Sequence, residues 1–434
     1  TDMKLKVSPA RVLRGEVTPP GDKSISHRAA ILNAIAQGKA RVTNFSPGAD
    51  GRATINCLRA LGVTFEEQGP SSLLVFGVGD KGLSEASEVL DAANSGTTMR
   101  LMTGLLAAQP FFSVITGDAS LRSRPMARVI EPLRLMGGEV WGRQGDSLPP
   151  LAIRGGPLRG IVYRLPVASA QLKSALLLAG LFAQGSSVIT EPQPSRDHTE
   201  RMLRAMGATV KGDGLRVNVA PLASPLTALD VQVPGDLSAA AFWLVAGAIH
   251  PQARITLRGV GVNPTRTGLL EVLESMGARV RQENQRLEGG EPVADLAVES
   301  AALRGTEIGG PLIPRVIDEL PILAVAACLA QGTTVIRDAG ELRVKESDRI
   351  STTVQELSRL GAEIEEKPDG MIVHGGRELR GNLCHSHGDH RLAMALGVAG
   401  LVARGETIIE GAEAVEISYP GFWQDMERLS RAGG

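Results

Sequence analysis

The chain has 434 residues, enough for two or three domains, and 43% of them are apolar, so a large core can form. The formal net charge of −1 excludes a bulk electrostatic attraction to nucleic acid or to anionic membranes. Cys57, Cys328 and Cys384 are too few and too scattered for a disulfide framework, so we expect a reducing cytoplasm. No apolar run is long enough for a transmembrane helix, and no secretory leader precedes Met3.

The strongest signal in the sequence is an internal repeat. A phrase of the form Leu-x-x-Leu/Met-Gly-small-x-β-former occurs five times, and a degenerate sixth copy follows; the copies start at Leu58, Leu133, Leu203, Leu273, Leu357 and Leu429. They recur about every 70 to 85 residues, close to one sixth of the chain. Each copy predicts an amphipathic surface helix that ends at a glycine and is followed by a strand.

Almost wholly apolar segments alternate with this phrase, and a helix that is apolar on all sides is normally buried. They span residues 26–36, 97–108, 170–183, 237–248, 320–330 and 391–403. Each repeat therefore predicts one buried helix, one surface helix and several strands. We predict an α/β fold of two pseudo-threefold domains with three repeats each, made of residues 20–234 and of residues 1–19 plus 235–434.

Cations lie within or near the first turn of four of these buried helices, at Lys23 and Arg28, Arg100, Lys173 and Arg391. The helix dipole makes a cation at this end unfavourable by ~0.3–1 kcal/mol. A bound anion would offset that cost, so we interpret the helix ends as parts of an anion-binding cleft. The alternative interpretation is an ordinary N-cap with solvated cations beside it.

Three motifs in the first half of the chain are candidate anion sites. Lys23-Ser24-x-Ser26-x-Arg28 follows a Pro-Pro-Gly turn signal and lacks the spacing of a Walker A motif. The run from Asn94 to Thr98 is a small, polar helix entry with free backbone N–H groups. Arg124 could contact a carboxylate or phosphate through two N–H groups. Simple helix capping and solvated arginines remain the alternatives for this set.

Further helix entries carry polar residues. Ser169-Ala-Gln171 precedes a helix, and so does the run from Ser195 to Thr199, in which Ser195 is a candidate N-cap and Arg196 a candidate anion contact. Asp318-Glu319 opens an otherwise apolar helix. A carboxylate at this position usually interacts with the helix dipole, but near a cationic cleft it could act as a base.

A dense charge run spans residues 341–350 and follows a predicted strand at Thr333–Ile336. A strand-to-helix junction in an α/β fold exposes backbone N–H groups toward a ligand. Lys345, Glu346 and Arg349 would then hold an anion and a proton-transfer acid together. The alternative is a solvated helix face, which the charge pattern alone fits equally well.

One motif points to a different chemistry. His385-Ser-His-Gly-Asp-His390 matches the His-x-His-x-Asp-His pattern of metallo-β-lactamase-like zinc hydrolases. That pattern needs further ligands downstream, and no histidine follows His390. We therefore expect no metal site here.

Taken together, these motifs resemble the 5-enolpyruvylshikimate-3-phosphate synthase family (3-phosphoshikimate 1-carboxyvinyltransferases), class II, over essentially the whole chain. The resemblance rests on Asp22-Lys-Ser-Ile-Ser-His-Arg28, Asn94-Ser-Gly-Thr97, Arg124-Pro-Met126, Ser169-Ala-Gln171, Arg343-Val-Lys-Glu-Ser-Asp-Arg349 and Asp389-His-Arg391. It implies an inverse α/β barrel of the enolpyruvyl transferase type, with three β-α-β-α-β-β units in each of two domains and the active site in the cleft between them.

The resemblance also implies the reaction. The enolpyruvyl group of phosphoenolpyruvate moves to the 5-hydroxyl of shikimate 3-phosphate by addition and elimination through a tetrahedral intermediate, and phosphate leaves. No metal or organic cofactor is implied, and glyphosate is the implied inhibitor. We expect a cytoplasmic enzyme of chorismate and aromatic amino acid biosynthesis, and a monomer, because no long exposed apolar helix face stands out.

By family match, the catalytic residues are Asp318 as base, Glu346 as proton donor, and Lys23. The residues implied for shikimate 3-phosphate are Lys23, Ser24, Arg28, Ser169, Ala170, Gln171, Arg196, Asp318 and Lys345. The residues implied for phosphoenolpyruvate are Lys23, Asn94, Gly96, Arg124, Gln171, Arg349 and Arg391.

Two positions depart from patterns seen in parts of the family: Leu101 stands where many class I members have proline, and Ile417 where some members have lysine. Sensitivity to glyphosate therefore stays open, although we expect glyphosate to fit beside Gly96. Two alternative functions remain, namely an enolpyruvyl transferase acting on another sugar-like acceptor and a noncatalytic anion-binding protein of the same fold. Phosphate release that needs both substrates would separate them.

Overall fold

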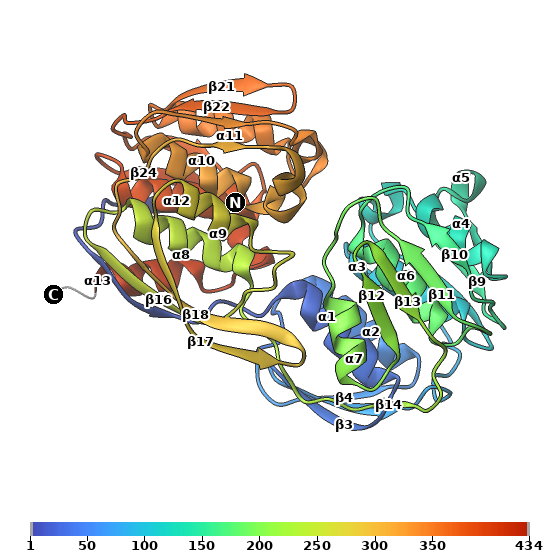
Figure 1. The fold of residues 1–434 in the computed structure, drawn as a ribbon. Coiled ribbons are helices and arrows are strands. Elements are labelled where there is room, and N and C mark those ends of the chain that lie inside the picture. Colours follow the sequence, from blue (N-terminus) through green and yellow to red (C-terminus); the bar gives the residue numbers. More distant parts are fainter. Residues whose placement is uncertain (1–2, 432–434) are drawn as a thin grey trace. The chain divides into compact units, whose positions relative to one another are not determined.

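The structure, a computed structural model, describes residues 3–431 and divides into two compact units (Figure 1). Unit 1 is made of Thr1–Pro20, Gly235–Arg286 and Pro292–Gly434, and unit 2 of Gly21–Pro234 and Leu287–Glu291. Within residues 3–431, each unit contains three small β-sheets and three buried helices, so the sixfold repeat predicted from the sequence is present as two sets of three.

The three sheets of unit 2 share one pattern, in which a parallel pair is extended by two antiparallel strands. The first sheet has the strand order β14 (Leu226–Thr227)–β3 (Ala36–Thr43)–β5 (Leu73–Val78)–β4 (Thr64–Glu67), and β15 (Val231–Gln232) also pairs with β3. The second sheet has the order β6 (Leu90–Asp91)–β7 (Phe112–Thr116)–β9 (Leu148–Arg154)–β8 (Glu139–Gly142). The third has the order β10 (Val162–Arg164)–β11 (Ser187–Thr190)–β13 (Arg216–Val219)–β12 (Val210–Asp213). The last strands of the unit thus complete its first sheet, which closes the unit on itself.

Unit 1 repeats the arrangement with the first strands of the chain included. One sheet has the strand order β2 (Leu13–Val17)–β16 (Ala253–Gly261)–β18 (Glu291–Glu299)–β17 (Arg279–Glu288). The next has the order β19 (Glu307–Ile308)–β20 (Thr333–Ile336)–β22 (Gly370–His374)–β21 (Glu363–Lys367). The last is three-stranded, with the order β23 (Leu383–His385)–β24 (Thr407–Glu410)–β1 (Lys4–Val7). β1 is antiparallel to β24 and β2 is parallel to β16, so the N-terminal strands complete two of its sheets.

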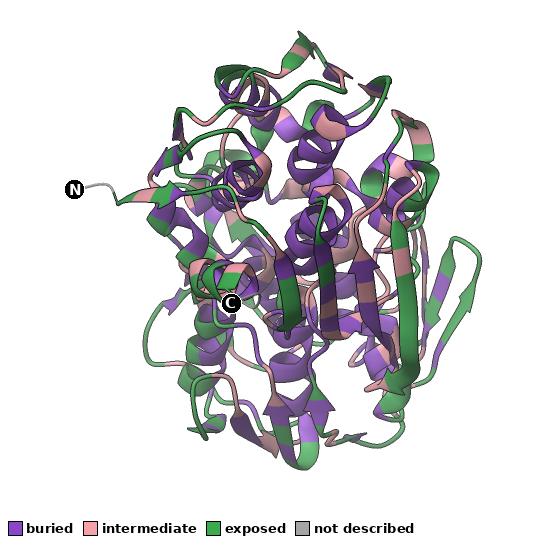
Figure 2. Ribbon diagram, turned by 90° about the vertical axis from the view of Figure 1, so that its left-hand side faces the viewer, coloured by how far each residue is buried: buried purple, intermediate pink, exposed green. Residues whose placement is uncertain are grey.

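The six predicted buried helices are all present, with boundaries shifted by a few residues. They are α1 (Lys23–Ala34), α3 (Gly96–Ala107), α6 (Ala170–Gly180), α8 (Leu237–Ile249), α10 (Leu320–Leu329) and α12 (His390–Val402). Figure 2 shows helices that are buried along most of their length. α8 and α10 are rich in alanine, and these small side chains let neighbouring helices approach closely.

The predicted surface helices are α2 (Ala49–Ala60), α4 (Ala127–Leu135), α7 (His198–Ala205), α9 (Gly268–Ser275), α11 (Arg349–Arg359) and α13 (Phe422–Arg431). Five of them end at the predicted glycines, whose φ angles lie between 86° at Gly361 and 96° at Gly207, where a side chain would be strained. In the sixth copy Leu429 lies in α13, and Gly433 lies outside the described residues.

The remaining short elements are α5 (Arg143–Asp146) and the 3₁₀ helices η1 (Leu121–Ser123), η2 (Gly310–Arg315), η3 (Ile317–Glu319), η4 (Gly340–Val344) and η5 (Ala412–Ile417). None of the helices within residues 3–431 has the length and apolarity that a membrane crossing requires.

Candidate active site

A dense charged cluster in unit 1 is built around Arg349, the first residue of α11. The chain leaves β20, forms η4 and then starts α11, where the side chain of Asp348 caps the helix by accepting from the backbone N–H of Ser351 at 3.1 Å. The charge run therefore lies at a strand-to-helix junction, as the sequence predicts. The Arg349 side chain is only 2% exposed although it is charged, so it must be paired.

The Arg349 guanidinium contacts three carboxylates. Its Nε and Nη2 donate to Asp389 at 2.8 and 3.3 Å, and Nη2 also donates to Glu346 at 2.6 Å. Its Nη1 lies 3.6 Å from Asp318 Oδ1. The Asp389 side chain is 0% exposed, whereas Glu346 is 48% exposed, so one end of Arg349 is anchored in the interior while the other reaches an accessible carboxylate.

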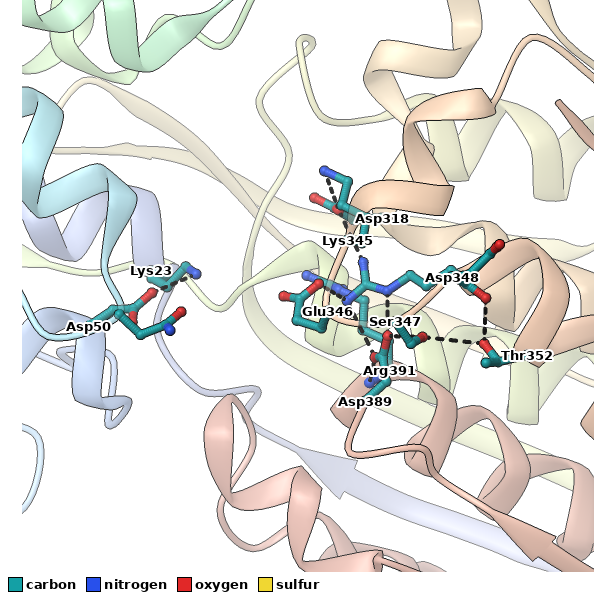
Figure 3. A network of polar contacts seen from close by, with 12 residues as sticks. Lys23, Asp50, Asp318, Lys345, Glu346, Ser347, Asp348, Thr352, Asp389 and Arg391 are labelled. Carbon is teal, nitrogen blue, oxygen red and sulfur yellow. Dashed lines mark hydrogen bonds and ion pairs between the residues drawn. The ribbon is translucent and has the colours of Figure 1, made fainter. Parts of the chain in front are cut away.

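Asp318 lies in η3, immediately before α10, and a second cation approaches it. Lys345 Nζ is 3.9 Å from Asp318 Oδ1, and both side chains are partly exposed. Figure 3 shows Asp318, Lys345, Glu346 and Asp389 around one centre in unit 1, with Arg391 beside them. The structure thus brings together all the residues of unit 1 that the resemblance assigns.

The pKa values in this cluster follow from burial and from neighbouring charge. Burial opposes ionisation of Glu346, but Arg349, a backbone hydrogen bond at Glu346 and Arg391 outweigh it, so the pKa of Glu346 is lowered. Burial likewise acts against the charge of Arg391, yet Asp318 and other nearby carboxylates raise its pKa. Glu346 is therefore a carboxylate beside cations in the unliganded protein.

One structurally central residue of unit 1, Asp389, had no role assigned to it from the sequence. Asp389 accepts from Arg349, from Ser347 Oγ at 3.0 Å and from the backbone N–H of Arg391 at 2.9 Å, so it joins α11 to α12. It stands inside the histidine-rich motif and within the family anchor Asp389-His-Arg391, and neither pattern indicated that it pairs with Arg349. Asp389 directly precedes a predicted helix and accepts from the N–H two residues later, so its position as an acidic N-cap is the signal that could have identified it.

A second cluster, in unit 2, surrounds the start of α1. Asp22 caps this helix by accepting from Ile25 N at 2.9 Å, and Lys23 Nζ lies 2.9 Å from Asp50 Oδ2 at the start of α2 (Figure 3). Burial raises the pKa of Asp50, but Lys23, His27 and Arg124 reverse this effect and lower it. Asp50 was also missed, because a single acidic residue in a first turn is common in helices.

The entry of α3 lies among arginines. Arg124 donates from Nη2 to Asn94 Oδ1 at 2.7 Å, and Asn94 Nδ2 donates to Asp118 at 2.6 Å. A Cβ atom at Gly96 would lie 2.5 Å from Arg100 Nη1 and 3.5 Å from Arg124 Nη1. Two guanidinium groups therefore stand directly over the helix start, which is a suitable arrangement for an anion.

Gln171 joins the start of α6 to the same region. Its Oε1 accepts from Arg100 Nη1 at 3.0 Å, and its Nε2 donates to Thr97 Oγ1 at 2.9 Å. Ser169 caps α6 by accepting from Leu172 N at 3.3 Å, and Ala170 is the first residue of the helix.

Arg28 is buried, and all three of its guanidinium nitrogens donate to protein oxygens. These oxygens belong to Thr199 at 2.7 Å, the Ser24 carbonyl at 2.9 Å and Ser174 at 2.9 Å. Arg196 is half-buried in the segment before α7 and adds to the positive field at Arg28.

Two expectations for unit 2 are wrong. Ser195 does not cap α7: Asp197 occupies the N-cap position, and Ser195 Oγ donates instead to Glu191. Lys173 does not present a cation to an anion-binding cleft, because its side chain is 2% exposed and ion-paired with Glu191 at 3.0 Å and Glu200 at 2.8 Å. In both cases buried carboxylates, which local sequence does not reveal, attract the polar group.

Two histidines of the histidine-rich motif interact with glutamate side chains. His385 Nδ1 lies 2.8 Å from Glu410, and His387 Nε2 lies 2.8 Å from the buried Glu356. Burial and neighbouring cations lower the pKa of His390 to about 3, so its imidazole is neutral. Within residues 3–431, no group of three or more His, Cys, Asp or Glu side chains is placed to hold a metal ion.

Comparison with solved structures identifies the type of fold. The enolpyruvyl transferase NikO from Streptomyces tendae superposes with a TM-score of 0.78 over 99% of this chain and 98% of its own, at 17% identity. This similarity defines the class of protein by fold: the chain has the fold of the enolpyruvyl transferases, as predicted.

Closer relatives define the family. The EPSP synthase family profile (3-phosphoshikimate 1-carboxyvinyltransferase) matches residues 7–426. The 3-phosphoshikimate 1-carboxyvinyltransferase of Desulforudis audaxviator is 58% identical over 98% of this chain and 99% of its own length, and that of Herpetosiphon aurantiacus is 56% identical over 99% and 100%. The structure of EPSP synthase from Acinetobacter baumannii has a TM-score of 0.93 at 44% identity, covering 99% of this chain and 98% of its own. The chain belongs to the EPSP synthase family, which confirms the resemblance read from the motifs.

Proposed function

We propose that this chain transfers the enolpyruvyl group of phosphoenolpyruvate to the 5-hydroxyl of shikimate 3-phosphate and releases phosphate. The proposal is supported by family membership and, most directly, by one geometric observation: Arg349 holds Asp318 and Glu346 on the same guanidinium. The reaction needs a base for a hydroxyl proton and an acid for a vinyl carbon, next to cations that bind phosphate and carboxylate groups.

In this reaction Asp318 takes the proton of the attacking 5-hydroxyl, and the hydroxyl oxygen forms a bond to C2 of phosphoenolpyruvate. Glu346 delivers a proton to the methylene carbon, which gives a tetrahedral adduct. Loss of a proton from the resulting methyl group, with departure of phosphate, restores the double bond. Lys345 and Arg349 lie beside the Asp318 carboxylate before it accepts the proton, and Arg349 stabilises the negative charge that develops on the leaving phosphate.

The lowered pKa of Glu346 has to be reconciled with a role as proton donor. A phosphate and a carboxylate bound beside Arg349 and Arg391 would neutralise the cations that lower this pKa. Binding of phosphoenolpyruvate is therefore expected to favour the protonated form of Glu346 and so prepare it for proton transfer.

The substrate contacts that the family match implies are part of this proposal. Shikimate 3-phosphate is held by Lys23, Ser24, Arg28, Ser169, Ala170, Gln171, Arg196, Asp318 and Lys345. Phosphoenolpyruvate is held by Lys23, Asn94, Gly96, Arg124, Gln171, Arg349 and Arg391. Residues from both units are needed, so the two clusters act on the same substrates and complete one active site when these bind.

The direct test is an assay of phosphate release with each substrate alone and with both. Release that requires shikimate 3-phosphate and phosphoenolpyruvate together supports the proposal. Release that proceeds with a different acceptor, or no release at all, would contradict it in favour of the two alternatives.

The base assignment has its own test in the Asp318→Asn variant. This variant should keep substrate binding but lose ~10²-fold or more of kcat, because general acid–base groups contribute on that order. Isothermal calorimetry measures binding, and phosphate release measures turnover. The exposed Asp213, replaced by Asn, is the matched control and should retain activity. Full turnover in Asp318→Asn would rule out the base role.

Three further features belong to the proposal. Glyphosate competes with phosphoenolpyruvate beside Gly96, which a competition assay measures. The protein is a monomer, which light scattering measures. It acts in the cytoplasm, because charged phosphorylated substrates do not cross membranes unaided and because Cys57, Cys328 and Cys384 are unpaired.

A further inference from the structure

A buried ionic network lies behind the helix starts of unit 2, centred on Lys173 in α6. Its Nζ atom is 3.0 Å from Glu191 Oε2 and 2.8 Å from Glu200 Oε1, and the three side chains are 2%, 5% and 2% exposed. Burying a charge is costly unless it is paired, and breaking such a pair leaves an uncompensated charge. This network has no assigned part in substrate binding or in the proposed proton transfers.

Arg28 supplies the second buried cation of the same region. Burial lowers the pKa of Arg28 to about 10, while Glu200 and Asp22 favour its charged form. The guanidinium is therefore still charged at neutral pH. Glu200 is therefore shared by the two buried cations, because it is ion-paired with Lys173 and also acts on the charge of Arg28.

Hydroxyl groups connect the ionic network to Arg28. Ser174 follows Lys173 in α6 and Thr199 precedes Glu200 in α7, and their hydroxyl oxygens are 2.7 Å apart. Arg28 donates from Nε to Thr199 at 2.7 Å and from Nη2 to Ser174 at 2.9 Å. The pairing of Lys173 with Glu200 therefore holds together the two helices whose neighbouring hydroxyls orient the guanidinium.

Arg28 keeps donor capacity for a ligand. Within the described residues, its three protein hydrogen bonds use three of the five guanidinium N–H groups. The network also extends to the segment before α7, because Glu191 accepts from Ser195, which adjoins Arg196.

We propose that Lys173, together with Ser174 and Thr199, positions Arg28 for anion binding. The network holds the guanidinium in one orientation before shikimate 3-phosphate arrives, so little reorganisation is needed on binding. The inference rests on the proposed function, in which Arg28 contacts shikimate 3-phosphate. These are positioning residues, because they act through Arg28 and not on the reacting atoms.

The main test is Thr199→Val, which removes one anchor of Arg28 with little change in shape and no change in buried charge. Isothermal calorimetry should show about tenfold weaker binding of shikimate 3-phosphate, the effect typical of a hydrogen bond to a charged group. The KM for phosphoenolpyruvate should stay near the wild-type value, because Arg28 is not among its contacts. This split between the two substrates is a readout that a general loss of stability would not produce.

Lys173→Met is the second variant, and it should weaken binding of shikimate 3-phosphate at least as much while lowering Tm. If Lys173→Met does not fold, Thr199→Val alone decides. The matched control is Asn33→Ala in the last turn of α1, because Asn33 is 0% exposed and pairs with Leu229 through 2.9 and 3.1 Å hydrogen bonds. Asn33→Ala should lower Tm and leave binding of shikimate 3-phosphate unchanged.

Wild-type affinity in Thr199→Val, or equal weakening by Asn33→Ala, would overturn the positioning role. Failure of the wild-type protein to bind shikimate 3-phosphate would instead overturn the proposed function. The two failures are therefore separated by the wild-type measurement.

Discussion

Asp318 and Glu319 are adjacent in sequence but lie in different environments. Asp318 is partly exposed beside Lys345 and Arg349, whereas Glu319 is buried and accepts a hydrogen bond from Ser238. Burial raises the pKa of Glu319, and the neighbouring Asp318 adds to this effect. Neighbouring carboxylates with different environments can take different roles, and here Asp318 is the accessible one, beside Lys345 and Arg349, as the proposed base requires.

The raised pKa of Glu319 predicts a pH-dependent stability with a definite sign. The folded protein retains this proton to a higher pH than the unfolded chain, so Glu319 lowers the free energy of unfolding as pH rises above the ordinary value of 4.5. Glu319→Gln stays neutral and should lack this contribution. The stability of the variant relative to wild type should therefore increase with pH until the raised pKa is passed.

Urea unfolding at a series of pH values from about 4 to 8 measures this difference. Glu416→Gln is the control, because Glu416 is an exposed side chain of the same unit and should give parallel curves. Parallel curves for Glu319→Gln as well would contradict the prediction.

At the scale of the elements, the functional residues come from the starts of buried helices. Short polar side chains cap most of these helices, including Asp22 on α1, Ser95 on α3, Ser169 on α6 and Asp389 on α12. Each cap satisfies one orphan N–H and leaves others available for an anion. The location of these ends depends on close helix packing, which the small residues of the helices permit.

The contact of α3 with α6 shows how closely the helices approach. A Cβ atom at Gly104 would lie 2.2 Å from the backbone carbonyl oxygen of Ala175, which cannot move away as a flexible side chain could. Gly104→Ala should therefore separate the two helices, destabilise the protein by about 1–3 kcal/mol and disturb the Arg100–Gln171 hydrogen bond at their starts.

Thermal unfolding and the KM for phosphoenolpyruvate together measure this effect. Gly156→Ala is the matched control, since a Cβ atom there would meet nothing within 4 Å. A Gly104→Ala protein with wild-type Tm and KM would show that α3 and α6 tolerate the extra methyl group.

At the scale of the whole molecule, the assigned residues are divided between the two units. Lys23, Gly96 and Arg124 belong to unit 2, and Asp318, Lys345 and Arg391 to unit 1. If both sets bind the same substrates, an anionic ligand that contacts both units should favour conformations in which the two units are closed around it.

We therefore predict that small-angle X-ray scattering will show a smaller radius of gyration when shikimate 3-phosphate and glyphosate are both present. Lys345→Gln, which removes one cation from unit 1, should weaken this response at fixed ligand concentration. An unchanged radius of gyration at saturating ligand would contradict closure by substrate.

The sequence by itself determined the repeat, the helices and the family. Glycines at fixed helix ends and helices apolar on all sides are local signals, because they depend on φ angles and on which faces meet water. The motifs at the starts of the buried helices are also local in sequence, so they could be matched to the family residue by residue.

Only the tertiary structure decided the partners of the charged residues. Lys173 looked like another cation at a helix start, but Glu191 and Glu200 pair with it in the interior. Likewise Asp389 lay in a histidine-rich pattern typical of zinc sites, yet it anchors Arg349. Such pairings join residues up to 40 positions apart, and burial selects the pairs, because an unpaired charge in the interior costs more than any local pattern can offset.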